Sequence, residues 1–212
     1  MSDIFREIDE ELRRDHLLKL LSRYWPYLAA IVGLALAIAG GITFWHQHQL
    51  SLRQAQSNRY AVAATLASRG KSVEAARLFG AVAREGGGYA ELAAFQEAAL
   101  LAQSGHEKEA LAIYDHIATA DPHPAFRGLA VLLSTMRQMP QTAPKEIIAR
   151  LKPLTVAGNP WRASALELTA LAEIEAGDRS GARRIYQGLT TDPAAPPGLR
   201  ARAAELAAAL AS

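Results

Sequence analysis

The sequence predicts an all-α protein, in which a single N-terminal transmembrane helix is followed by an α-solenoid of about four helix pairs and a capping helix. Three observations support this prediction. An uninterrupted apolar run of 18 residues, 28–45, is long enough to cross a bilayer. Alanine, leucine, arginine and glutamate dominate the remaining chain, and runs of alternating β-branched residues are absent. A short motif also recurs at intervals near 35 residues, which is typical of stacked helical repeats.

Residues 1–23 precede the apolar run and are predicted to be a cytoplasmic amphipathic segment. Their apolar side chains recur at helical spacing on one face. Five Lys and Arg residues lie in this segment, whereas only Arg53 and Arg59 lie in the comparable stretch after the run. Because positively charged flanks stay on the cytoplasmic side, the N-terminus is expected in the cytoplasm and the C-terminal part across the membrane.

Residues 24–46 are predicted to be the transmembrane helix. No charged side chain occurs between Tyr24 and Leu52, aromatic residues flank both ends, and the apolar run gives about 27 Å of helix. A cleaved signal peptide is the main alternative, supported by two Ala-x-Ala motifs within 35–39. The long acidic leader and the continuation of the run to Trp45 disfavour it. A buried core helix of this length would carry a polar face, and this segment has none.

Residues 47–212 are predicted to form one periplasmic domain, which is long enough for a substantial core. The chain contains no cysteine, so a disulfide framework is excluded. The formal net charge is +2, and the basic residues are scattered rather than clustered. Nucleic acid is therefore not an expected partner.

A motif of glycine, alanine and an aromatic residue marks three helix pairs. Alanine follows the glycine by five residues and the aromatic follows the alanine by four. A further alanine lies seven residues before each glycine. The motif residues are Gly70, Ala75 and Phe79, then Gly105, Ala110 and Tyr114, and finally Gly177, Ala182 and Tyr186.

The motif predicts how each pair reverses and packs. Glycine ends the first helix in the left-handed conformation. The small alanine and the aromatic share one face of the second helix, which favours close packing of two antiparallel helices. The period and this signature resemble the tetratricopeptide repeat. A third pair lacks the motif and has Pro140 and Pro144 near its turn, but its phase fits and its apolar residues recur at helical spacing, at Ile147, Ile148, Leu151 and Leu154. The predicted pairs are 53–88, 89–124, 125–158 and 160–193, with a capping helix at 197–211.

No residue constellation supports catalysis, so the protein is not expected to be an enzyme. His46 and His48 are the only closely spaced histidines, and no carboxylate accompanies them at metal-ligand spacing. The glycines at 86–88 lack the strand and the Lys-Ser/Thr of a phosphate-binding loop. No metal, cofactor or catalytic residue is predicted.

A peptide-binding groove is the candidate functional site. In stacked arrays the first helices line a concave surface. Tyr60, Phe95 and Glu167 are equivalent, each ten residues before the motif glycine, and Leu171 lies one turn after Glu167. These four residues are the predicted groove. Two alternatives stay open for Tyr60 and Phe95, which either contact a bound peptide or pack inside the superhelix.

The order of charged leader, single span and short alanine-rich array resembles the YfgM-like family of bacterial inner-membrane tetratricopeptide proteins, ancillary subunits of the Sec translocon. The resemblance covers essentially the whole chain and rests on residues 1–15, the span, the repeats and the segment 192–210. It implies a single-pass inner-membrane protein that contacts Sec translocon subunits, a periplasmic folding factor and unfolded clients, with a chaperone-like role for proteins crossing the membrane. A scaffold for another envelope assembly, such as cell division or cytochrome biogenesis, is the alternative.

Overall fold

A computed structural model describes residues 34, 38–51 and 53–211. The predicted cytoplasmic segment, 1–23, and most of the predicted transmembrane segment, 24–46, lie outside these residues. Within the described part of the chain, no helix is both long and apolar enough to cross a membrane. The chain divides into two compact units, Met1–Ala55 and Gln56–Ser212. In the first unit, residues 38–51 are helical and expose Ile42, Phe44 and Trp45.

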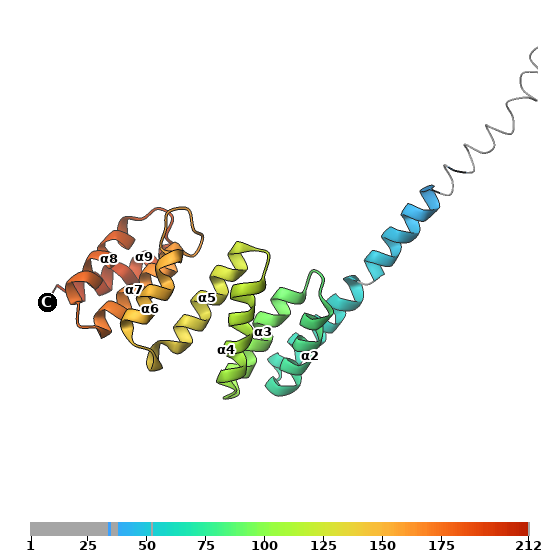
Figure 1. Cartoon of the computed structure of the whole chain (residues 1–212), viewed down its shortest axis with the longest axis horizontal. Helices are drawn as coiled ribbons and strands as arrows, with labels where there is room; N and C mark the ends of the chain where they lie inside the picture. The colour runs from blue at the N-terminus through green and yellow to red at the C-terminus, as the bar shows by residue number, and fades with distance from the viewer. Residues whose placement is uncertain (1–33, 35–37, 52, 212) are drawn as a thin grey trace, which may run out of the picture. The chain divides into compact units, whose positions relative to one another are not determined.

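The second unit is an array of helices, each packed against the next along the chain (Figure 1). It confirms the predicted all-α helical array, and no strand occurs in the described ranges. α7 also packs against α5 and α9, so first helices contact one another across repeats. After a helical run that ends at residue 68, the helices are α2 (Ser72–Glu85), α3 (Ala90–Gln103), α4 (Glu107–Ala120), α5 (Pro124–Gln138), α6 (Pro144–Leu151), α7 (Arg162–Glu175), α8 (Arg179–Thr191) and α9 (Pro197–Ala209).

Three glycines reverse the chain inside the helix pairs. Gly70, Gly105 and Gly177 have φ values of 78°, 82° and 87°, in the left-handed region that side chains with a Cβ disfavour. The backbone N–H of each donates to a carbonyl three residues earlier, which satisfies one of the carbonyls left free at the helix end. The second helix then begins two residues after the glycine.

Alanines and aromatic residues form the core of each of these pairs. In the first pair, Ala63, Ala75 and Phe79 lie in one buried cluster, and the same three positions form the clusters of the second and fourth pairs. All six alanines at these positions are fully buried. Two alanines facing each other let the backbones approach closely, and the aromatic ring fills the space at one side.

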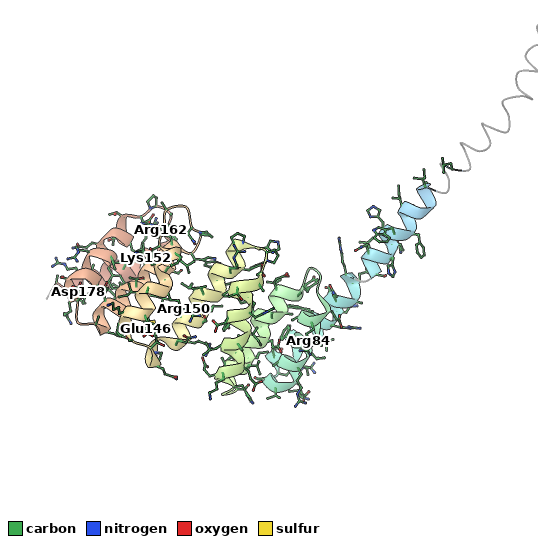
Figure 2. The ribbon with its side chains drawn as sticks, in the orientation of Figure 1. Arg84, Glu146, Arg150, Lys152, Arg162 and Asp178 are labelled. Carbon is green, nitrogen blue, oxygen red and sulfur yellow. The ribbon has the colours of Figure 1, made fainter. Side chains whose placement is uncertain are left out.

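The third pair holds together differently, because it lacks the motif. α6 has only eight residues and is preceded by a 3₁₀ turn at Met139–Gln141. Its core is made of aliphatic side chains, among them Leu132, Ile147 and Leu151, and Arg150 of α6 (Figure 2) adds hydrogen bonds. Its guanidinium donates to Asp115 Oδ1 at 2.7 Å, Ser134 Oγ at 2.9 Å and Gln138 Oε1 at 3.1 Å. These contacts join α4, α5 and α6 through one side chain.

The glycine turns give a matched pair of substitutions. We expect Gly177→Ala to lower the free energy of unfolding by about 1–2 kcal/mol, because φ is +87° although a Cβ meets no atom within 4 Å. Gly188→Ala, inside α8 and equally uncrowded, should instead raise it by about 0.5–1 kcal/mol. Urea unfolding of both variants checks this; equal effects would show that the turn does not require glycine.

The aromatic position gives a second test. Tyr186 is fully buried, and its hydroxyl has no hydrogen-bond partner among the described residues. We expect Tyr186→Ala to cost about 3–5 kcal/mol, since it leaves a cavity against Ala170 and Ala182. Tyr186→Phe should keep the ring and raise the stability by up to about 1 kcal/mol, since it removes a buried unpaired hydroxyl. A large loss of melting temperature for Tyr186→Phe would mean that the hydroxyl is bonded.

Candidate functional site

Tyr60 lies where the first helix pair meets the second. Its ring is half-buried, with its centroid 5.0 Å from that of Phe79 and 5.3 Å from that of Tyr89. Phe79 belongs to the same pair, whereas Tyr89 immediately precedes α3 of the next. Tyr89 also donates its hydroxyl to Ser57 Oγ at 3.2 Å. Tyr60 therefore stacks one repeat on the next.

Phe95 repeats this arrangement one pair later. Its ring centroid is 6.1 Å from that of Tyr114 in the same pair and 6.1 Å from that of Phe126, on α5 of the next pair. Burial raises the pKa of the Tyr114 hydroxyl, although Arg137 acts in the opposite direction. The ring of Phe95 packs against this cluster and remains partly accessible.

Glu167 occupies the equivalent position in the fourth pair and replaces the ring contact with an ion pair. Its carboxylate oxygens accept from Arg202 of α9 at 3.1 and 3.2 Å. The hydrogen bond and the negative charge of Glu167 raise the pKa of the Arg202 guanidinium. Burial, and then the charge of Glu167, raise the pKa of Tyr186. All three equivalent residues therefore contact the next element of the array.

The predicted groove residues are not brought together in one cluster. Tyr60, Phe95 and Glu167 each lie at a separate contact between one helix pair and the element that follows it. This agrees with packing inside the superhelix, and peptide binding by their accessible edges stays a prediction. The remaining groove residue, Leu171, is 37% exposed on α7.

A broader and mostly apolar set of residues recurs at helical spacing on the first helices. On α3, Leu92, Phe95, Ala99 and Ala102 follow one another at spacings of three and four; on α7, Glu167, Leu171 and Ile174 do the same. We call these seven residues the first-helix stripe. Leu92 is 47% exposed, which makes it the most accessible large side chain of the stripe. Sequence reasoning missed Leu92, because the equivalent positions carry Ser57 and Ser164 and no recurrence marks it.

A polar group of different character lies at the ends of α3 and α4. Glu91, Asp121 and His123 each offer a ligand atom, and these atoms lie within 4.8 Å of one another. This trio has the chemistry to hold a divalent cation. However, Asp121 Oδ1 already accepts the His123 backbone N–H at 2.6 Å, so the turn itself satisfies this buried carboxylate. Sequence analysis missed the trio because Glu91 and Asp121 are 30 residues apart.

Comparison with known proteins gives one family. The family model of the tetratricopeptide repeat-like domain matches residues 19–196. No curated protein matches the chain.

Two carboxylates should show opposite pH dependence. Burial raises the pKa of Glu97, whose carboxylate lies over Gly80, so the folded state binds its proton more tightly than the unfolded state. Its contribution to stability should fall as pH rises through the folded pKa. Hydrogen bonds from Gly181 and Ser180 lower the pKa of Asp178, so its contribution should be lost as pH falls through the folded pKa.

We therefore expect Glu97→Gln to raise the melting temperature at pH 7 and Asp178→Asn to lower it. Both differences should shrink below about pH 4, where the carboxyl groups protonate in either state. Melting temperatures measured between pH 3 and pH 8 check this, and a destabilised Glu97→Gln at pH 7 would contradict it.

Proposed function

We propose that this protein, which belongs to the tetratricopeptide repeat-like family, is a scaffold anchored in the bacterial inner membrane that holds other proteins on its first-helix stripe. Domains of this family are protein–protein interaction scaffolds and are typically not enzymes. The observation that carries the proposal is the stripe, where Leu92 and Leu171 stay exposed although every repeat buries its second-helix face. Exposed apolar side chains beside a half-buried ring suit an apolar segment of a partner.

The anchoring part of the proposal rests on residues 24–46. Their length, lack of charge and aromatic flanks match a bilayer-spanning helix. The family match begins at residue 19, so the sequence that the family shares includes this segment together with the array. The excess of Lys and Arg before residue 24 favours a cytoplasmic N-terminus and a periplasmic array.

The proposed partners follow from the resemblance to the YfgM-like family. They are Sec translocon subunits, a periplasmic folding factor and unfolded chains that emerge across the membrane. An ancillary, chaperone-like role needs weak binding to many apolar sequences, and a shallow stripe of leucine, phenylalanine and alanine side chains fits this need better than a deep specific pocket.

Photo-crosslinking in cells tests the proposal. A photo-reactive residue at Leu92 or Leu171 should give adducts with translocon subunits or secreted chains. The same residue at Val73 or Val156, which are 51% and 57% exposed but lie outside the stripe, should give few. Mass spectrometry of the adducts identifies the partners. Adducts with other envelope assemblies alone would favour the alternative scaffold, and equal labelling at all four sites would contradict a binding face.

A reporter fused after Ser212 tests the orientation. We expect a reporter that works only in the periplasm to be active there, and one that works only in the cytoplasm to be inactive. The opposite result would overturn the proposed topology without bearing on the stripe.

A further inference from the structure

Three arginines surround a hollow at the last repeat. Arg179, Arg183 and Arg184, in the first two turns of α8, line a cavity of about 460 Å³ together with Ser180, Gln187 and Leu210. All three arginines are exposed. We call them the α8 arginine face; Asp178, which precedes it, is labelled in Figure 2. The hollow lies where the beginning of α8 meets the end of α9.

These arginines differ from those that stabilise the array. Arg179 and Arg183 form no ion pair or side-chain hydrogen bond within the part of the chain that the structure describes. Arg184 donates to Ser180 Oγ at 3.4 Å, and the pKa of Asp178 is lowered by the hydrogen bonds from Gly181 and Ser180 and also by the charge of Arg184. Five other arginines instead pair with carboxylates on other helices or, for Asp192, at the C-cap of one. These pairs are Arg59–Glu85, Arg137–Glu107, Arg150–Asp115, Arg162–Asp192 and Arg202–Glu167.

The position of Arg179 is unfavourable for the helix. Helix N-termini carry a partial positive charge, and the second helices α2, α4 and α6 place Glu74, Glu107 and Glu146 in their first turns. α8 has no acidic residue in its first turn and begins with Arg179, while the preceding residue, Asp178, caps the helix by accepting the backbone N–H of Gly181. Arg183, four residues later, adds a like-charge repulsion on the same face.

Packing does not explain the arginines either. The positions equivalent to Arg179 and Arg183 carry Ser72 and Ala76 in the first pair. The same fold therefore forms without positive charge at these positions. Positive charges that oppose the helix dipole and serve no packing role are expected at a functional surface.

We propose that the α8 arginine face is a second docking surface, which binds acidic segments of partner proteins. Guanidinium groups form paired hydrogen bonds with carboxylates, and Arg179 and Arg183 stand one helical turn apart, so they can hold two acidic side chains of one segment. Leu210 offers an apolar wall for the aliphatic part of those side chains. The inference rests on the proposed scaffold function and deepens it. It adds acidic segments to the partners, which the apolar first-helix stripe does not suit.

Binding of a fluorescent, glutamate-rich decapeptide to the purified full chain, measured by fluorescence anisotropy in one detergent, tests this. We expect the double variant Arg179→Glu/Arg183→Glu to weaken binding by about tenfold or more, and added salt to weaken it in the original protein. The control is Arg69→Glu/Arg77→Glu, which makes the same charge change at exposed arginines of the first pair and should leave binding unchanged. Because acids suit a helix N-terminus, the α8 variant should also melt no lower than the original, so a loss of binding is not a loss of folding.

Three results would overturn the inference. The first is that the original protein does not bind the peptide. The second is that both double variants weaken binding equally. The third is that the peptide is displaced by inorganic phosphate, or by anionic lipid vesicles at concentrations where neutral vesicles have no effect. The last would assign the face to phosphate groups. Binding of an unfolded, uncharged client, measured in parallel, separates this inference from the proposed function. The α8 variant should bind the client as the original protein does. If the original protein does not bind the client, the proposed scaffold function itself is contradicted.

Discussion

Close packing of an alanine pair beside one aromatic ring is the interaction on which the array depends. Alanines such as Ala98 and Ala110 bring the two helices of a pair together, and Tyr114 fills the space that remains. Each such pair still leaves apolar surface uncovered, which only the next pair can bury. This constraint explains why the pairs stack, why Tyr60 and Phe95 contact the next pair, and why α9 is needed at the end.

The same constraint separates the residues that build the array from those available to partners. Second helices are covered on the motif face, whereas Leu92 and Leu171 on the first helices stay exposed beside residues that contact the next element. Binding to these two exposed side chains need not disturb the core. α8 differs from the other second helices because it exposes a group of arginines. In our proposal, these arginines bind acidic segments and so add a second kind of recognition to the same short array.

Much of this architecture could be predicted from the sequence, because the motif is local. The spacing of Gly105, Ala110 and Tyr114 fixes a helix end, a turn and a buried face within ten residues. The third pair could be placed by its phase and by the helical spacing of its apolar residues. The bonds of Arg150 could not be predicted, since they reach residues 12, 16 and 35 positions away. Exposure of Leu92 and the meeting of Glu91 with Asp121 depend on how repeats stack, and no local pattern encodes them. The contact of Tyr60 with Tyr89, a residue of the next repeat, agrees with packing, and peptide binding by the accessible edge of Tyr60 stays a prediction.

The most direct test of the account is hydrogen–deuterium exchange of the full chain with and without an unfolded client protein. The account predicts added protection in the first helices α3 and α7. It predicts little change in α2 and α4, whose motif faces are already buried in the core. Protection confined to the second helices, or a uniform change across all repeats, would contradict a binding face formed by the first helices.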